Sequence, residues 1–333
     1  MGTPSWLPPV HRRPDLPAAV RIWEVAPRDG LQNESSIVPA RVKAELVARL
    51  VGAGLTTVET SSFVNPAWVP QLADAEEVFS LLEPLRVTRG QVHGAALHFP
   101  ALVPNLRGLE RAVSSGVRDV CVFASATETF ARKNLNRSRN EALEMFVPVV
   151  TAAKAGGLGV RAYVSMCFGD PWEGSVAEAD VVSVCERLLA MGADEVSLGD
   201  TIGVATTGQV VDVLDALARA GVPAHRIAVH FHDTYGQALA NTLTALSCGV
   251  TTVDTSAGGI GGCPFAKSAT GNLATEDLCW ALAGAGVSTG VDLDGLVETS
   301  VWMAERLGRP SPSKVVQALA PISQGNQMTG SEG

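Results

Sequence analysis

Short apolar runs rich in β-branched residues recur along this chain at intervals of about 33 residues, a spacing typical of strands that alternate with helices. A glycine suited to a helix end precedes several of the runs, and helical patterns such as residues 41–51, 106–114 and 207–220 lie between them. Strands that alternate with helices pair in parallel. The eight runs are residues 21–25, 56–59, 97–103, 119–123, 160–165, 195–198, 227–232 and 252–255.

Eight strand–helix repeats predict an α/β chain folded as a (β/α)8 TIM barrel, with its chemistry at the carboxyl ends of the strands. The main alternative is an open doubly wound sheet. That fold usually carries a G-x-G-x-x-G segment or a P-loop after its first strand, whereas the first strand here ends in Ala-Pro-Arg-Asp-Gly at 26–30 and no P-loop motif occurs. Helical patterns at 292–307 and 313–319 predict additional C-terminal helices outside the barrel.

The chain is expected to contain one domain. Residues 1–20 hold five prolines and are interpreted as an irregular lead-in, residues 21–320 as a single TIM-barrel catalytic domain, and residues 321–333 as a polar tail. The lead-in lacks the apolar core of a secretory signal, and the six cysteines form no C-x-x-C pair. We therefore expect free thiols and a cytoplasmic location.

Composition excludes several classes of protein. A hydrophobic content of 46% excludes a disordered chain. The net charge of −9 argues against nucleic acid as a partner. No apolar run approaches the roughly 18 residues that a membrane span needs, so no membrane partner is expected.

A His-x-His pair ends the seventh predicted strand. Residues i and i+2 of a strand face the same side, so His230 and His232 can both address one point in the barrel mouth. A carboxylate from Asp29 and an amide oxygen from Asn272 can complete a cation site there. Such a mixed nitrogen and oxygen set favours six-coordinate Mg²⁺ or Mn²⁺ over four-coordinate Zn²⁺. Taken singly, each residue also fits an ordinary hydrogen-bonded role at a strand end or turn.

Other polar side chains are expected at the same end of the barrel. Arg28 can offer a permanent positive charge to a developing oxyanion, or can form a plain ion pair with Asp29. Glu59, Tyr163 and Asp200 lie on or at the ends of the second, fifth and sixth predicted strands.

A glycine-rich segment leads into one cysteine. Four glycines in the five residues 258–262 exclude a regular strand or helix and precede Cys263. The segment can be a tight turn that needs positive φ angles. A thiol at the end of such a loop over the barrel mouth is also well placed for proton transfer, whereas the other cysteines are expected to be buried core residues.

Six segments carry motifs: RDGLQNE at 28–34, ETSSF at 59–63, KNLN at 133–136, SLGDTIG at 197–203, HFHDTYGQALAN at 230–241 and GGIGGCPFAK at 258–267. Together they resemble the 3-hydroxy-3-methylglutaryl-CoA lyase family, from about residue 21 to 318. The Arg-Asp-Gly and His-x-His-Asp elements also occur in a wider superfamily of metal-dependent barrels that make and break carbon–carbon bonds. The glycine segment with its cysteine, followed by GNLATED at 271–277, is more specific to the lyases.

This resemblance implies metal-assisted retro-aldol (Claisen-type) cleavage of (S)-3-hydroxy-3-methylglutaryl-CoA to acetyl-CoA and acetoacetate, in leucine catabolism or ketone-body metabolism. It also implies an acyl-CoA substrate and a homodimer. The family's cation ligands, for Mg²⁺ or Mn²⁺, correspond to Asp29, His230, His232 and Asn272.

The resemblance implies further roles. Arg28 would hold the thioester oxygen as it becomes an enolate, and Cys263 would protonate that enolate. Glu59 and Asp200 resemble the family's site carboxylates, and the general base is one of these two or Asp29. The candidate substrate-binding residues are Arg28, Tyr163, Arg132 and Lys133, the last two for the phosphates.

Three alternatives keep the same barrel. One is a lyase for a longer 3-hydroxy-3-alkylglutaryl-CoA, since pocket-lining side chains decide the acyl chain. Another is a condensing synthase of the 2-isopropylmalate or homocitrate type, although such enzymes usually carry Glu where this chain has Leu31 and need an extra C-terminal region. The third is a non-catalytic acyl-CoA-binding or metal-binding barrel, which would lack a ligand or the thiol, and none is missing here.

Overall fold

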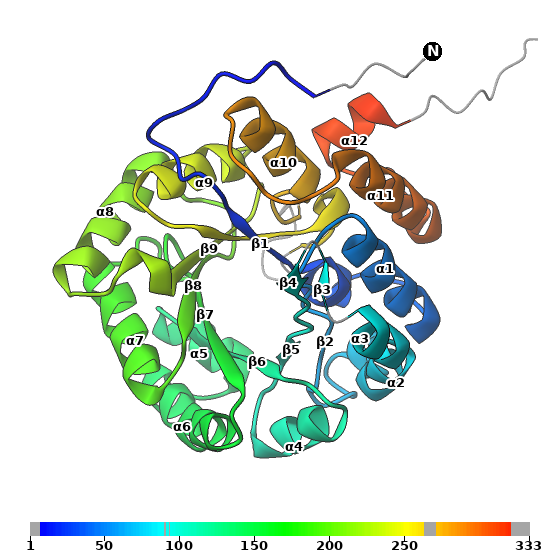
Figure 1. The fold of residues 1–333 in the computed structure, drawn as a ribbon. Helices are drawn as coiled ribbons and strands as arrows, with labels where there is room; N and C mark the ends of the chain where they lie inside the picture. Colours follow the sequence, from blue (N-terminus) through cyan, green and yellow to red (C-terminus); the bar gives the residue numbers. More distant parts are fainter. Residues whose placement is uncertain (1–6, 90, 93, 263–270, 321–333) are drawn as a thin grey trace, which may run out of the picture.

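The computed structural model describes residues 7–89, 91–92, 94–262 and 271–320. Its eight parallel strands follow one another in the order β1-β10-β9-β8-β7-β6-β5-β2, and a parallel bridge between Glu24 and Val58 joins β1 to the segment that leads into β2. The sheet is therefore closed, which confirms the TIM barrel (Figure 1). The strands are β1 (Arg21–Glu24), β2 (Ser61–Ser62), β5 (Ala101–Leu102), β6 (Asp119–Ser125), β7 (Gly159–Ser165), β8 (Glu195–Asp200), β9 (Ile227–Phe231) and β10 (Thr252–Thr255).

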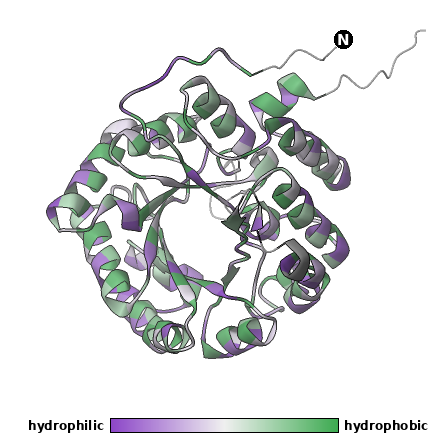
Figure 2. Cartoon of the chain, viewed as in Figure 1, coloured by the Kyte–Doolittle hydropathy of each residue, from purple (hydrophilic) through white to green (hydrophobic). Residues whose placement is uncertain are grey.

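Helices surround the strands, and α11 and α12 pack beside α10 outside the ring, as the C-terminal helical patterns predict (Figure 1). Hydrophobic and hydrophilic residues are mixed on the surrounding helices (Figure 2), because each helix buries one face against the sheet. The helices are α1 (Ala40–Gly52), α2 (Ala75–Leu81), α3 (Glu83–Arg89), α4 (Leu106–Ser114), α5 (Glu128–Leu135), α6 (Arg139–Ala155), α7 (Glu178–Met191), α8 (Thr207–Arg219), α9 (Ala238–Ser247), α10 (Thr275–Gly284), α11 (Leu293–Leu307) and α12 (Lys314–Leu319).

The glycines predicted at helix ends have a steric role at Gly54. This residue follows α1 with a φ of +96°, and a Cβ atom there would lie 2.3 Å from the carbonyl oxygen of Gly290. Only glycine meets both conditions without strain, so the chain can turn sharply from α1 toward the next strand.

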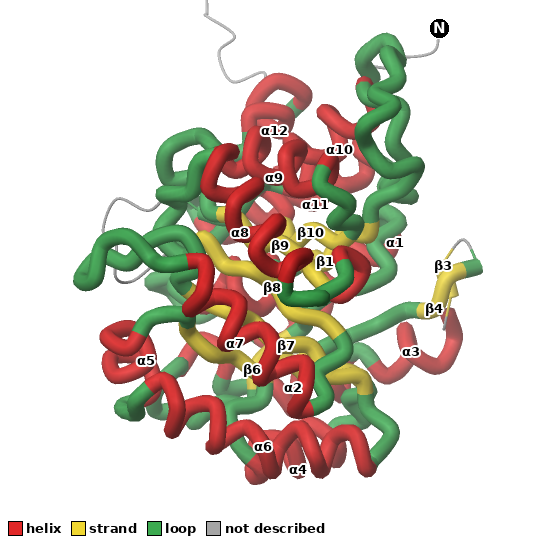
Figure 3. The backbone as a smooth tube through the Cα atoms, turned by 90° about the vertical axis from the view of Figure 1, so that its left-hand side faces the viewer, coloured by secondary structure: helices red, strands yellow, loops and turns green. Residues whose placement is uncertain are grey.

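The second and third predicted strands are less regular than their sequences suggest. Regular pairing is limited to β2 and β5, and Thr57 and His98 contribute only a single bridge. Pro100 lies between His98 and β5 and cannot donate a ladder hydrogen bond, which interrupts the strand. Before it, β3 (Gln91–Val92) and β4 (Ala95–Ala96) form an antiparallel hairpin that stands away from the barrel in Figure 3.

The described residues contain no helix that is long and apolar enough to cross a membrane. The polar tail at 321–333 lies outside the described residues.

Candidate active site

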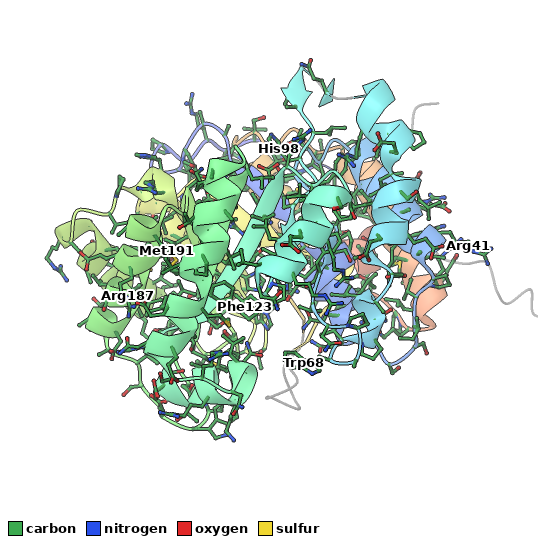
Figure 4. The ribbon with its side chains drawn as sticks, turned by 90° about the horizontal axis from the view of Figure 1, so that it is seen from below. Arg41, Trp68, His98, Phe123, Arg187 and Met191 are labelled. Carbon is green, nitrogen blue, oxygen red and sulfur yellow. The ribbon has the colours of Figure 1, made fainter. Side chains whose placement is uncertain are left out.

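A cavity of about 420 Å³ opens at the carboxyl ends of the strands. One side is polar and contains Arg28, Asp29, His230 and His232. Another part of the lining, its apolar side, includes Trp68 and Phe123, both of which lie below His98 in Figure 4. A larger cavity of about 580 Å³ lies at the amino ends of β1 and β10, away from these groups. In the cavity at the carboxyl ends of the strands, the apolar side is formed by Val64, Trp68, Leu102, Phe123, Phe130 and Leu135.

Three metal-ligating side chains converge on the polar side of this cavity. Asp29 comes from a π-helical turn, Ala26–Gly30, that follows β1, while His230 lies on β9 and His232 directly after it. One ligand atom from each of the three lies within 4.8 Å of the others. The two Nε2 atoms are 3.2 Å apart, and His230 Nε2 lies 3.9 Å from an Asp29 oxygen. The predicted shared direction of the two imidazoles is therefore present.

Asn272 joins this cluster from a neighbouring segment. It forms an antiparallel bridge with His232, and its Nδ2 donates hydrogen bonds to Asp29 (3.0 Å) and to the carbonyl of Ile260 (3.2 Å). Its Oδ1 atom is buried and has no hydrogen-bond partner among the described residues, and neither does Nδ1 of His232. Buried polar atoms without partners are costly. An unpartnered oxygen beside a carboxylate and two imidazoles fits a divalent cation.

Protonation states suit a cation as well. Burial opposes the ionisation of Asp29, but Arg28 and both imidazoles outweigh it and lower the pKa of Asp29 to about 2. Burial, with the charge of His230 added, lowers the pKa of His232 to about 4. At neutral pH the site therefore presents a carboxylate and a neutral imidazole, the forms that bind metal ions.

Arg28 is fixed at the cavity wall by carboxylates. Its Nε donates to Glu59 and its Nη1 to Asp29, both at 2.6 Å, and its guanidinium lies 5.2 Å from the ring centre of Tyr163. Glu59 is fully buried and also accepts hydrogen bonds from Trp23 (2.9 Å) and from the Tyr163 hydroxyl. The structure thus brings Arg28, Glu59 and Tyr163 together, with Glu59 beneath the other two rather than in the cavity lining.

A buried aspartate that sequence reasoning missed supports His230. Asp254 lies on β10 in register with His230 and accepts a hydrogen bond from its Nδ1 at 3.2 Å. It also accepts from Ser197 (2.9 Å) and forms a two-pronged ion pair with Arg161. A proton held on Nδ1 leaves the Nε2 lone pair facing the cluster. The signal in the sequence was an aspartate within an otherwise uncharged strand.

The ion pairs continue through the barrel interior. Arg161 on β7 donates to Glu195 at 2.8 Å, and Glu195 also pairs with Arg21 at the start of β1. Arg161 and Asp254 are buried, whereas the Arg21 side chain is 48% exposed. An unbroken chain of charged contacts therefore runs from the amino-terminal face of the barrel to His230.

Asp200 lies near the site but is turned toward the backbone. Its two carboxylate oxygens accept hydrogen bonds from the amides of Val204 (2.9 Å) and Ala205 (3.0 Å), in the loop before α8. Burial raises the pKa of Asp200 to about 6. Its neighbours Gly199 and Thr201 line the cavity, whereas Asp200 does not.

The remaining predicted residues lie at the edge of the site or outside the described chain. Arg132 is exposed on α5 and pairs with Glu128 at 2.7 Å, and Lys133 Nζ lies 4.8 Å from the ring centre of Trp172. Neither lines the cavity, although the next two residues of α5 do. Cys263 lies outside the described residues, and Gly262, which precedes it, lines the cavity.

Comparisons with known proteins give a consistent result. Residues 19–302 match the family described as HMGL-like. The mitochondrial hydroxymethylglutaryl-CoA lyase of Bos taurus is 48% identical over 92% of this chain and 91% of its own length.

Two solved structures are also similar. The hydroxymethylglutaryl-CoA lyase of Pseudomonas aeruginosa has a TM-score of 0.86 at 46% identity and covers 92% of this chain and 98% of its own. An HMG-CoA lyase of Acinetobacter baumannii, solved with coenzyme A and 3-methylmalate, has a TM-score of 0.83 at 32% identity, over 95% and 99% of the two chains. The resemblance in the sequence motifs is confirmed, and the chain belongs to the HMGL-like family.

Proposed function

We propose that this protein cleaves (S)-3-hydroxy-3-methylglutaryl-CoA to acetyl-CoA and acetoacetate, the reaction implied for leucine catabolism or ketone-body metabolism. The observation that carries the proposal is the convergence of Asp29, His230 and His232 in one cavity, with Asn272 hydrogen-bonded to Asp29 and the guanidinium of Arg28 beside them. Retro-aldol cleavage needs a group that lowers the pKa of the substrate hydroxyl, which the metal-binding cluster would provide, and a positive charge that stabilises the enolate, which Arg28 would provide. The hydroxymethylglutaryl-CoA lyases among its relatives support the same substrate.

The cation is proposed to be Mg²⁺ or Mn²⁺, held by Asp29, His230, His232 and Asn272. When bound, such an ion supplies Lewis-acid chemistry that lowers the pKa of a coordinated hydroxyl. The protein orients His230 toward the ion through the Asp254 hydrogen bond and keeps Asp29 ionised through Arg28. These two contacts prepare the ligands before the substrate arrives.

Arg28 is proposed to bind the thioester oxygen. As the C2–C3 bond breaks, its electron pair moves onto C2 and the thioester, C3 becomes the ketone of acetoacetate, and the hydroxyl proton passes to a base. A guanidinium fixed by Glu59 can stabilise the enolate without moving, and loss of a comparable donor costs about 10²–10³ in rate. Protonation of C2 completes acetyl-CoA, and Cys263 is the proposed donor.

The general base is proposed to be Asp200 or Asp29, because the contacts of Glu59 are those of a residue that positions Arg28 and Tyr163. A base is most effective with a pKa near the working pH. The pKa of Asp200, about 6, meets that condition better than the pKa of Asp29, about 2, whereas Asp29 lines the cavity and Asp200 does not. With Asp200 as the base, kcat rises with pH through about 6, and Asp200→Asn removes that limb of the profile.

The direct test is cleavage of 3-hydroxy-3-methylglutaryl-CoA by the purified, thiol-reduced protein, with Mg²⁺ and with EDTA. Equal amounts of acetyl-CoA and acetoacetate, lost with EDTA and restored by metal, are the expected result. No cleavage by the metal-loaded protein contradicts the proposal. Turnover of only a longer 3-hydroxy-3-alkylglutaryl-CoA, for which the apolar side of the cavity offers room, favours the first alternative. CoA release from acetyl-CoA and a 2-oxoacid favours the synthase.

The protein is further proposed to act as a homodimer in the cytoplasm and to bind the phosphates of its acyl-CoA substrate with Arg132 and Lys133. Light scattering after size exclusion tests the dimer. The double substitution Arg132→Ala/Lys133→Ala is expected to raise KM without lowering kcat. Unchanged KM contradicts the phosphate contact.

A further inference from the structure

Glu24, the last residue of β1, is a buried carboxylate outside the cluster described above. It is completely inaccessible to solvent. It accepts hydrogen bonds from the backbone amides of Ala26 (2.8 Å) and Ala257 (2.9 Å) and from the hydroxyl of Thr275 (2.7 Å). No ion pair within the described chain involves Glu24, so its charge is stabilised by hydrogen-bond donors and not by a cationic side chain.

The three donors come from three different elements, and each element leads to the cation site. Ala26 is the first residue of the turn that carries Arg28 and Asp29. Ala257 begins a short turn whose following residue, Ile260, accepts a hydrogen bond from Asn272. Thr275 begins α10, directly after the segment that holds Asn272. One carboxylate therefore ties the Asp29 side of the site to the Asn272 side.

A second buried carboxylate, Glu276, contacts the same turn, Ala257–Gly259. Its two oxygens accept from the amide of Gly258 at 3.0 and 2.9 Å, and it also accepts from the hydroxyl of Ser300. The turn packs closely against the neighbouring segment, since a Cβ atom on Gly271 would lie 2.0 Å from the carbonyl oxygen of Gly259. With so little room, a shift of this turn is passed directly to Asn272.

These carboxylates are costly to bury. Burial raises the pKa of Glu24 to about 7 and that of Glu276 to about 8. Well-packed apolar side chains of similar volume would often stabilise a core as well or better. Two buried acids aimed at the turns on either side of the cation ligands are better explained by a requirement for geometry than by stability.

We infer that Glu24 is a positioning residue for the cation site and that it sets the separation between Asp29 and Asn272, with Glu276 supporting it. The inference rests on the proposed function, because it assigns a purpose to the same site. Its test, however, measures metal affinity directly and does not depend on turnover.

The test is Glu24→Gln, which keeps the size of the side chain but removes its charge and replaces the oxygen that accepts from the Thr275 hydroxyl with an NH₂ group, which cannot accept a hydrogen bond. Loss of such supporting contacts lowers metal affinity about 10–100-fold, and we expect at least a tenfold rise in the Kd for Mn²⁺ by titration calorimetry. Glu276→Gln, whose backbone contact is with Gly258 rather than with the turn that carries Asp29, is expected to raise the Kd by less. If Glu24→Gln does not fold, Thr275→Val removes one donor and is expected to raise the Kd about threefold.

The matched control is Asp277→Asn. Asp277 follows Glu276 on α10 and accepts hydrogen bonds from the backbone amide of Val315 on α12 (2.8 Å) and from the hydroxyl of Ser313, the residue preceding α12 (2.7 Å). Its substitution is expected to lower the free energy of unfolding and to leave the Kd for Mn²⁺ unchanged. An unchanged Kd in folded Glu24→Gln, or an equal change in the control, overturns the inference. A wild-type protein that binds Mn²⁺ but cleaves no substrate refutes the proposed function and leaves this inference standing on the Kd values.

Discussion

The substitution Asp254→Asn tests the contribution of the barrel interior to both metal binding and stability. Asp254 is fully buried and makes three kinds of contact, to His230, Ser197 and Arg161. The amide keeps the volume and one acceptor oxygen but loses the charge. It can also turn its NH₂ group toward His230, which moves the imidazole proton from Nδ1 to Nε2 and removes the ligand lone pair.

Both effects can be given a magnitude. Loss of a residue that orients a metal-bound histidine costs about 10–100-fold in metal affinity, or about 1.4–2.7 kcal/mol. Arg161 loses its ion pair with Asp254 and keeps the one with Glu195, and breaking a buried ion pair costs about 3–5 kcal/mol of folding free energy. We therefore expect a higher Kd for Mn²⁺ by calorimetry and a lower midpoint of urea unfolding.

Ser197→Ala serves as the control, since it removes one hydrogen bond to Asp254 at 2.9 Å and leaves the contacts with His230 and Arg161 in place. It is expected to change the Kd less than threefold. A folded Asp254→Asn protein whose Kd for Mn²⁺ stays within twofold of wild type refutes the reasoning, because His230 would then be oriented without Asp254.

Three further predictions address the ligands, the thiol and the buried acids. His232→Ala weakens Mn²⁺ binding by calorimetry, and an unchanged Kd rejects its role as a ligand. Cys263→Ser keeps the metal affinity of wild type but lowers kcat about 10²–10⁴-fold, as expected for loss of a proton donor, and wild-type kcat removes the thiol from the mechanism. The pKa of Glu276 is raised by burial from 4.5 to about 8, so the folded state holds an extra proton between these values. Its contribution to stability is complete below pH 4.5 and is lost as the pH rises through 8, and Glu276→Gln should flatten this decline in the free energy of unfolding.

The local pattern of the sequence predicted the barrel and the His-x-His pair because both depend on short-range periodicity. The side on which His230 and His232 lie follows from the two-residue repeat of a strand, whatever the strand pairs with. The partnership of Asp254 with His230 depends on the register of β10 against β9, which appears only when the sheet closes. Pattern reading placed Asp200 in the site as a strand-end carboxylate, but it could not show that the following loop supplies backbone donors to both oxygens.

Glu24 was missed for a similar reason. In the sequence it is an acidic residue at the edge of an apolar run, which is indistinguishable from a solvent-exposed strand end. Its three donors are separated along the chain by more than 200 residues, from Ala26 to Thr275, and only the folded structure brings them together.

The chain of charges through the barrel also restricts how such a sequence can diverge. Arg161 contacts Asp254 and Glu195, and Glu195 in turn contacts Arg21. Replacing any one of these residues therefore leaves the charge of another without its partner. A penalty of a few kcal/mol is a large share of the roughly 5–15 kcal/mol that keeps a domain folded. Substitutions inside this barrel should therefore accumulate in compensating pairs. Related proteins that lack this series of ion pairs are expected to lack several of its residues together.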